Sequence, residues 1–283
     1  MGRKPEPSLE RSIRDKAILN VVNKPAVAAS FGAAAHSYDA AAVVQDEIRK
    51  RLLGRLDDLA LKPSCLLDLG GGTGIARKAL LQRYPTSQYI NCDLSQEMLQ
   101  YARKAHSADD LVCADAESLP FAESSFDVVF SASTFQWLNT LESALLECAR
   151  VLRPKGVLLF STFGPETLNE LRSSFAAVDP YPRVNSFLDR QEVSDLLLKN
   201  GLSQPCVESE VIRIDYTSPK QLLRSLKNTG ATNQLGGRSR GLLTPRRLQA
   251  ALSEYEAYKT EQGQYYASYE VIYGFAWQSG TRE

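Results

Sequence analysis

Short apolar runs alternate with stretches of helical periodicity between residues 65 and 162. Each run is short enough to be a buried strand, and each intervening stretch repeats apolar residues at the spacing of one helix face. The predicted strands are 65–69, 88–92, 111–114, 126–131 and 157–162, and the predicted helices are 75–84, 96–105 and 141–152. Strands that alternate with helices in this way predict a doubly wound α/β fold, with a parallel sheet and helices on both of its faces.

The segments outside this repeat follow a different rhythm. Residues 26–59 are rich in alanine and repeat apolar residues at near-helical spacing, which predicts one helical segment. Farther along, the predicted helices are 165–177 and 189–200, joined by a proline-rich turn at 179–182, and the predicted strands are 207–216 and 265–277. Between these strands we expect helices with a break at Gly236 and Gly237. The predicted organisation is a flexible leader over 1–24 and a single domain over 25–283, with helical inserts at about 164–204 and 217–262.

Composition narrows the class of protein. Of the 283 residues, 43% are apolar, which is enough to build a sizeable core. The 33 basic residues balance 33 acidic ones, so the chain as a whole predicts no strongly polyanionic partner. Five cysteines without a C-x-x-C pair and two distant histidines favour reduced thiols over disulfides or a metal site. No apolar stretch is long enough to span a bilayer and no signal-peptide core is present, so we expect a cytoplasmic protein that does not bind membranes.

Glycine clusters directly after the first predicted strand, at Gly70, Gly71, Gly72 and Gly74. Glycine lets the backbone turn sharply and lets a ligand approach the main chain without a Cβ in the way. The spacing does not fit the G-x-G-x-x-G loop of dinucleotide-binding proteins, and there is no G-K-[ST] pair for a phosphate-binding loop. Asp68, just before the turn, places a carboxylate where an ammonium group would be favoured over a pyrophosphate. An ordinary strand-to-helix turn would explain one glycine but not four.

Acidic residues also follow the second and third predicted strands. Asp93 could accept hydrogen bonds from both ribose hydroxyls of a nucleoside, or it could cap a helix, although Ser95 is also available as a cap. Asp115, followed by Ala116, could receive the exocyclic amine of adenine. Met98 could flank the adenine ring or simply pack in the core. Because the carboxyl ends of parallel strands share one edge of the sheet, these acids predict a nucleoside-binding site there.

Five motifs in order resemble the motif set of class I S-adenosylmethionine methyltransferases. They are residues 68–74, Asp93, 115–121, 126–129 and 152–156. The resemblance implies a seven-stranded sheet whose last strand is antiparallel, for which 265–277 is the candidate. It also implies S-adenosylmethionine as cofactor and S-adenosylhomocysteine as product. The implied cofactor-binding residues are Asp68, Gly70, Gly72, Gly74, Asp93, Met98, Asp115 and Ala116.

Three further segments resemble the bacterial malonyl-acyl-carrier-protein O-methyltransferase family of biotin synthesis. They are residues 28–45, 135–138, and 222–233 with 243–245 downstream. The resemblance implies methylation of the free carboxylate of a malonyl thioester on acyl carrier protein, giving the methyl ester that primes pimeloyl formation. The insertion also loosely resembles a complex I assembly factor, but the intact helix that carries His36 and Tyr38 favours the biotin enzymes. A methyltransferase acting on a small carboxylic acid or a quinone remains an alternative.

The insertion between Tyr216 and Ser253 contains no Asp or Glu. Its seven basic residues are Lys220, Arg224, Lys227, Arg238, Arg240, Arg246 and Arg247. In a chain of balanced charge, such a one-sided segment could steer an acidic carrier protein and pair with a substrate carboxylate. Nucleic acid is the rival interpretation, but the segment has no aromatic residue beyond Tyr216 on which bases could stack.

Methyl transfer to a carboxylate needs no general base, because the nucleophile is already ionised near neutral pH. The protein has to align the reacting atoms and strip water from the carboxylate, so no catalytic triad is expected. Tyr38 is expected to cover the methionine end of the cofactor. Phe175 and Phe187 could line an acyl channel, with core packing as the alternative. Arg150 and Arg153 are expected to contact carbonyls of a core helix.

Overall fold

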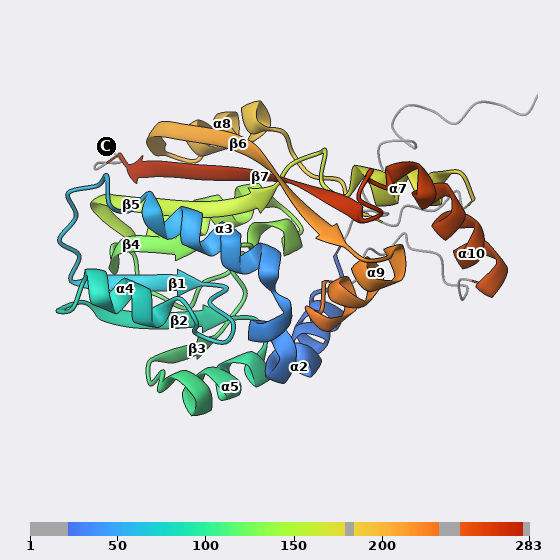
Figure 1. Ribbon diagram of the computed structural model, residues 1–283. Coiled ribbons are helices and arrows are strands. Elements are labelled where there is room, and N and C mark those ends of the chain that lie inside the picture. The colour runs from blue at the N-terminus through green and yellow to red at the C-terminus, as the bar shows by residue number, and fades with distance from the viewer. Residues whose placement is uncertain (1–21, 179–183, 232–243, 280–283) are drawn as a thin grey trace, which may run out of the picture.

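The computed structural model describes residues 22–178, 184–231 and 244–279. At its centre lies a seven-stranded sheet with the order β3-β2-β1-β4-β5-β7-β6 (Figure 1). The strands are β1 Cys65–Leu69, β2 Gln88–Asp93, β3 Leu111–Cys113, β4 Phe126–Ser131, β5 Leu152–Phe163, β6 Leu202–Tyr216 and β7 Tyr265–Gln278. The first five run parallel, and β7 is antiparallel to both β5 and β6. The predicted α/β sheet with an antiparallel last strand is therefore confirmed.

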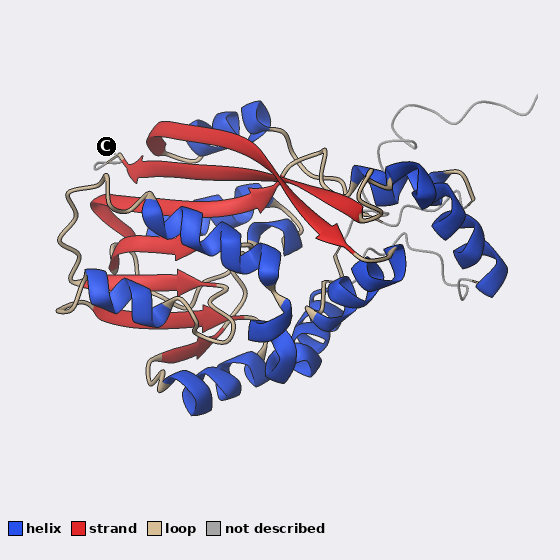
Figure 2. Ribbon diagram, viewed as in Figure 1, coloured by secondary structure: helices blue, strands red, loops and turns tan. Residues whose placement is uncertain are grey.

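Helices cover both faces of this sheet and the region beyond its carboxyl edge (Figure 2). They are α2 Lys24–Ala41, α3 Val43–Gly54, α4 Arg77–Arg83, α5 Gln96–His106, α6 Leu141–Val151, α7 Asn169–Ala176, α8 Arg190–Lys199, α9 Pro219–Asn228 and α10 Pro245–Glu254, with short 3₁₀ turns η1 Phe135–Trp137 and η2 Tyr255–Tyr258. In Figure 1, α2, α9, α7 and α10 lie beyond the arrowheads of the parallel strands. Strand order reverses between β1 and β4, the place where ligands bind in such sheets.

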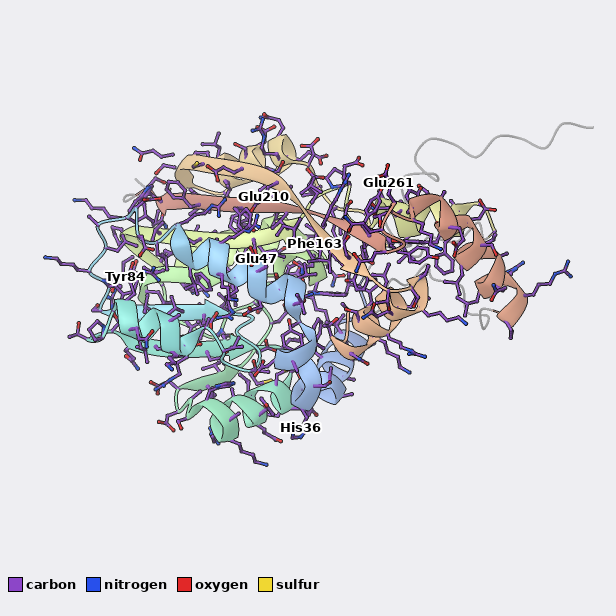
Figure 3. The ribbon with its side chains drawn as sticks, in the orientation of Figure 1. His36, Glu47, Tyr84, Phe163, Glu210 and Glu261 are labelled. Carbon is purple, nitrogen blue, oxygen red and sulfur yellow. The ribbon has the colours of Figure 1, made fainter. Side chains whose placement is uncertain are left out.

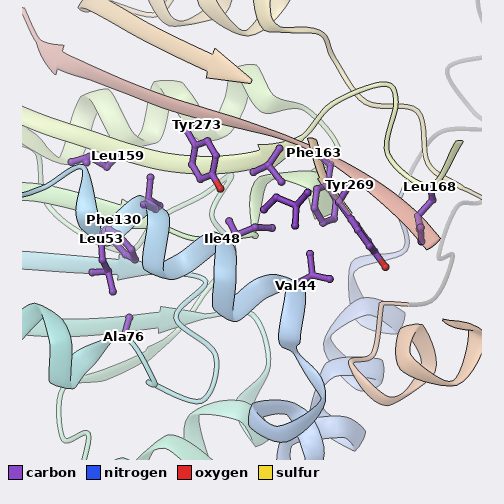
Figure 4. Close-up of a cluster of buried hydrophobic side chains, with 14 of the residues drawn as sticks. Val44, Ile48, Leu53, Ala76, Phe130, Leu159, Phe163, Leu168, Tyr269 and Tyr273 are labelled. Atoms are coloured by element: carbon purple, nitrogen blue, oxygen red, sulfur yellow. The ribbon is translucent and has the colours of Figure 1, made fainter. Parts of the chain in front are cut away.

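Two separate clusters of buried apolar side chains hold the layers together. One joins α3 and α4 to the sheet through residues such as Ile48, Leu80 and Phe130, and Figure 4 shows part of it. The other lies on the opposite face and includes Leu145 of α6 and Val193 of α8. Arg51 adds a polar link, since it bonds Glu47 of α3 and Glu210 of β6 at 2.8 and 2.5 Å, both labelled in Figure 3. None of the helices in the described ranges is both long and apolar enough to cross a membrane.

The helical segment expected over 26–59 is two helices that meet at Ala42. This residue adopts φ −83° and ψ 49°, outside the helical region, while its N–H still bonds the carbonyl of Tyr38 at 2.8 Å. Ala42 is buried and neither glycine nor proline marks the position, so periodicity alone could not locate it. The break lets α3 pack on the sheet while α2 passes over the carboxyl ends of the strands.

Several other boundaries differ from the predictions. Strand β5 already begins at Leu152 and passes through Pro154 and Gly156, although the predicted strand begins only at 157. Strand β6 begins at Leu202, earlier than predicted. Its register with β7 shifts between Ser203 and Cys206, so the start of the strand is hard to recognise from the sequence. Helix α7 begins only at Asn169, because the preceding Leu168 has a φ of +53°. The expected turn at 179–182 and the break at Gly236 and Gly237 lie outside the described residues.

Candidate active site

Two adjoining cavities lie at the carboxyl ends of β1, β2 and β4. The first, of about 90 Å³, is lined by Asp93, Asp115 and Met98, among others. The second, of about 60 Å³, is lined by Asp68 and Arg49, among others. Both cavities share the side chain or backbone of Tyr38, Gly70, Gly72 and Ala132. They therefore form one elongated space that follows the glycine loop and narrows beside Tyr38.

The glycine loop is shaped by positive φ angles and by close neighbours. Gly70, Gly72 and Gly74 have φ values of +71°, +53° and +76°, which side chains other than glycine rarely adopt. A Cβ on Gly70 would collide with Thr134, whereas one on Gly72 would meet only Asp93 Oδ2, at 3.9 Å. Gly72 thus faces the cavity. Gly74 lines neither cavity, and a Cβ there would lie 3.3 Å from Ala102, which makes it a packing position.

Asp93 holds the glycine loop and lines the first cavity at the same time. Its carboxylate accepts hydrogen bonds from the backbone N–H of Gly72 at 2.9 Å and of Ser95 at 2.8 Å. Burial raises the pKa of Asp93 to about 6, and these backbone donors oppose the shift. Ser95 itself caps α5 through the N–H of Met98 at 3.4 Å. Asp93 is consequently free of the capping role that was its alternative interpretation.

The second cavity brings opposite charges together. Asp68 is 2% exposed, and the Tyr89 hydroxyl donates to its Oδ2 at 2.5 Å. Burial raises the pKa of Asp68 to about 7, although this hydrogen bond pulls it down. Arg49 of α3 lines the same cavity and pairs with Asp46. A carboxylate and a guanidinium in one small space suit the ammonium and carboxylate groups of an amino acid.

Asp115 pairs with Lys24, a residue that was predicted to belong to the flexible leader. Lys24, the first residue of α2, places its Nζ 2.5 Å from Asp115 Oδ2 and also pairs with Glu117. Although burial lowers the pKa of Lys24, hydrogen bonds to these two carboxylates raise it above its ordinary value. Ala116 and Met98 line the same cavity. Neither Lys24 nor Arg49 stands in a recognisable motif, so no local signal could have identified them.

Helix α2 forms the roof over both cavities. Five of its residues line the first cavity: Lys24, Val27, Ala28, Phe31 and Tyr38. Near its end, Asp39 accepts a hydrogen bond from the Thr73 hydroxyl at 2.6 Å and lies 3.1 Å from the Nε2 of His106. Tyr38 lies where the two cavities meet, and burial, followed by the nearby carboxylates, raises the pKa of its phenol. Its hydroxyl therefore stays protonated at neutral pH.

A third cavity, of about 230 Å³, adjoins the first two. It shares Trp137 with the first and Gln45 with the second, and α7, η1, α9 and β7 all contribute to its walls. The walls are mostly apolar. Both Phe175 and Phe187 line it and also pack against the core, so their two interpretations coexist. This cavity offers an apolar passage that borders the first two cavities at Trp137 and Gln45.

The basic insertion lies next to this passage. Lys220, Arg224 and Lys227 are on α9, Arg246 and Arg247 are on α10, and all five are exposed. Among these five, Lys227 lines the third cavity. None of the five has an ion-pair partner within the described ranges. Arg238 and Arg240 lie outside the described residues.

The two arginines of the core contact carbonyls of a loop rather than of a helix. Arg150 donates to the carbonyl of Phe121 at 2.7 Å and to that of Leu119 at 3.0 Å. Arg153, in β5, donates to the carbonyl of Ser124 at 3.3 Å and to the carboxylate of Asp127 at 2.8 Å. The side chains of Arg150 in α6 and Arg153 in β5 thus hold the loop before β4, which corrects the expectation of a helix cap.

Comparisons with known proteins find similarity to methyltransferases, in agreement with the fold and the cavities described above. A family model described as "Methyltransferase domain" matches residues 67–160. A malonyl-[acyl-carrier protein] O-methyltransferase of Halorhodospira halophila is 41% identical over 263 residues, covering 92% of this chain and 89% of the relative. The crystal structure of the YcgJ protein from Bacillus subtilis has a TM-score of 0.57 at 19% identity and covers 82% of this chain and 100% of its own. Phosphoethanolamine N-methyltransferase 2 of Haemonchus contortus, solved with S-adenosyl-L-methionine, has a TM-score of 0.51 at 19% identity, over 81% of this chain and 52% of its own.

Proposed function

The chain belongs to the malonyl-[acyl-carrier protein] O-methyltransferase family, and we propose that it methylates the free carboxylate of a malonyl thioester carried by acyl carrier protein. S-adenosylmethionine is the methyl donor, and S-adenosylhomocysteine is the product. The observation that carries the proposal is the third cavity, which runs from the basic helix α9 to Trp137 and Gln45, the residues that it shares with the first two cavities. The methyl ester so formed would prime pimeloyl formation in biotin synthesis.

The residues around the first two cavities fit this cofactor. Gly72 leaves its backbone open to the cavity, and the second cavity carries both a carboxylate and a guanidinium. Asp68 would bind the ammonium group of the methionine moiety and Arg49 its carboxylate. Asp93 would accept hydrogen bonds from the ribose hydroxyls, while Asp115 would receive the adenine amine beside Met98 and Ala116. Bound in this way, the cofactor supplies a methyl group activated by a positively charged sulfur.

The chain itself has to align the reacting groups, exclude water from them and hold the charged groups in place. A carboxylate oxygen at the inner end of the third cavity forms a bond to the methyl carbon, while the carbon–sulfur bond breaks and its electron pair stays on sulfur. No proton moves in this step. Tyr38 stays a neutral phenol at the junction, so its part is to cover the reacting groups rather than to act as a base. The apolar walls contributed by Phe163 and Leu171 exclude water from the carboxylate.

Helix α9 supports the choice of a carrier protein as partner. Leu223 and Leu226 face the third cavity, whereas Lys220 and Arg224 of the same helix are exposed. One helix thus lines the acyl passage and offers positive charge to an acidic carrier protein. The proposal includes a cytoplasmic location, where free thiols such as Cys92 and Cys148 stay reduced.

Mass spectrometry of malonyl-acyl carrier protein, incubated with the protein and S-adenosylmethionine, tests the proposal directly. The expected result is a carrier species that gains one methyl group. A protein that binds S-adenosylmethionine but leaves the carrier unchanged would overturn it. In that case, methylation of free small acids or quinones would identify a small-molecule enzyme, and no methylation of any acceptor would favour a non-catalytic assembly factor.

A further inference from the structure

We propose that the side-chain amides of Gln136 and Gln45 receive the free carboxylate of the substrate at the inner end of the third cavity. The assignment rests on the proposed function and adds to it the groups that recognise the reacting end of the acyl chain. Both residues line that cavity, and they come from different elements, η1 and α3.

Gln136 is buried without the hydrogen bonds that a buried amide normally makes. It is 7% exposed, and its Oε1 has no hydrogen-bond partner among the residues that the structure describes. Such an unpaired polar group is costly unless a ligand completes it. Rotation about the last side-chain bond exchanges the amide oxygen and the NH₂ group, so the same position can present a donor to a carboxylate. The residue lies in the 3₁₀ turn η1, the first element after the carboxyl end of β4, and β4 is one of the two strands at which the strand order reverses.

Gln45 lies at the border between cofactor and acceptor. It lines both the second and the third cavity, and its amide has no hydrogen-bond partner within the described residues. Gln45 and Arg49 are four residues apart on α3, so they lie on the same face of the helix. Arg49 therefore faces the second cavity while Gln45 stands one turn closer to the third.

Neutral amides suit the chemistry better than a buried cation would. Lys227 is the one charged residue among the described residues that line the third cavity, and it is exposed at the end of α9. A buried ion pair would stabilise the free carboxylate and reduce its tendency to attack the methyl carbon. Amide donors orient the carboxylate through its second oxygen and leave the attacking oxygen less restrained. After transfer the ester has lost its charge, so the same donors hold it more weakly and the product can leave.

Replacement of each glutamine by leucine tests the assignment, with Gln191→Leu as the control. Gln191 is an exposed residue of α8 whose amide donates to Asp195 at 2.8 Å, and it lines none of the three cavities. For Gln136→Leu and Gln45→Leu we expect kcat/KM with malonyl-acyl carrier protein to fall roughly ten- to a hundredfold, as for loss of hydrogen bonds to a charged group. The Kd for S-adenosylmethionine should stay within about twofold of the wild-type value, and the control should match wild type in both measurements.

A second measurement separates recognition from a merely structural role. The wild-type protein should bind malonyl-acyl carrier protein more tightly than the carrier bearing the malonyl methyl ester, in the presence of S-adenosylhomocysteine. Both leucine variants should lose this preference, because an apolar side chain does not distinguish a carboxylate from an ester. Gln45 is only partly buried, so its variant keeps the test valid if Gln136→Leu does not fold.

The outcomes are distinguishable. If the wild-type protein methylates the carrier and both leucine variants keep kcat/KM within about twofold, or keep the preference for the carboxylate, the assignment of the amides is wrong and the proposed function stands. If the wild-type protein binds S-adenosylmethionine but does not methylate the carrier, the proposed function fails, and this assignment fails with it.

Discussion

The cofactor side and the acceptor side of the site meet at Gln45 and Trp137, yet different contacts build them. On the cofactor side, Asp93 and Asp68 are held by hydrogen bonds from the glycine loop and from Tyr89. On the acceptor side, apolar side chains from distant elements form the walls, and the buried amide oxygen of Gln136 has no hydrogen-bond partner in the described part of the chain. The cofactor side is thus fixed by its own short-range bonds, whereas the acceptor side depends on packing and on the ligand.

Of the changes on the cofactor side, Gly70→Ala should weaken the binding of S-adenosylmethionine most. The new methyl group would collide with Thr134, and the φ of +71° is unfavourable for alanine. The backbone strain alone amounts to about 1–3 kcal/mol, so we expect affinity for S-adenosylmethionine to fall roughly a hundredfold or more. Isothermal titration calorimetry measures the loss. Gly54→Ala is the matched control, because a Cβ there has no neighbour within 4 Å; a variant at Gly70 that binds within threefold of wild type would contradict the prediction.

Affinity for S-adenosylmethionine should depend on pH on the cofactor side. Since the pKa of Asp68 is raised to about 7, the free protein carries a proton on this carboxyl below that pH. An ammonium group binds the ionised form, so the proton has to leave on binding. Affinity should therefore fall up to about tenfold for each pH unit below 7 and level off above it. Asp93, with a pKa of about 6, should steepen the slope further below pH 6.

Calorimetry in buffers of different ionisation enthalpy measures the protons released and so checks this prediction independently. The Asp68→Asn variant should bind weakly at every pH and lose the dependence around pH 7. A flat pH profile for the wild-type protein would show that Asp68 is already ionised or does not meet the ammonium group.

Charge reversal on the acceptor side should weaken the binding of the carrier protein and leave the binding of S-adenosylmethionine unchanged. For Arg246→Glu combined with Arg247→Glu, we expect KM for malonyl-acyl carrier protein to rise roughly tenfold at low salt, and the effect to shrink as salt is added. The Kd for S-adenosylmethionine should not change. Lys104→Glu, an exposed charge reversal on α5, is the control and should leave KM unchanged. Equal effects of the two reversals, or an effect that salt does not weaken, would contradict carrier docking at α10.

The smallest expected effect concerns the hydrogen bond from Tyr89 to Asp68. In Tyr89→Phe, the hydroxyl that donates to Asp68 is gone, and this hydrogen bond lowers the pKa of that carboxyl. The midpoint of the pH dependence of cofactor binding should therefore move upward, with a loss of affinity of a few-fold at pH 7. The same calorimetric titration measures the shift. A midpoint that stays in place or moves downward would rule out this hydrogen bond as a determinant of the pKa of Asp68.

The sequence predicted the cofactor side well because the information there is local. A strand, an acid and a glycine turn stand next to one another at 65–74, and the later acids follow at the ends of β2 and β3. The structure brings Asp68, Asp93 and Asp115 around one elongated space, as the strand pattern suggested. Their roles toward the cofactor stay predictions.

The roof of the site and its junction with the acceptor side were less predictable, because they depend on a break between α2 and α3 that no residue type marks. Only the change of direction at Ala42 brings Lys24 to Asp115 and places Gln45 and Arg49 at the junction of the cavities. Composition did reveal the basic insertion, since a lack of acids is visible without structure. Which of its residues reaches the cavity is a matter of helix orientation, and in the described part of the chain this residue is Lys227.

Helix α2 is attached to both sides of the site. Lys24 bonds Asp115 at its start, while Ser30 donates to the carbonyl of Gly230 at 3.0 Å and Ser37 to that of Asn228 at 3.4 Å, at the end of α9. A helix of 18 residues is a rod about 27 Å long that does not bend easily. Because one rod spans both sides, its displacement at one end carries over to the other. We therefore expect the exchange of the cofactor and the departure of the carrier to be coupled in time through this helix.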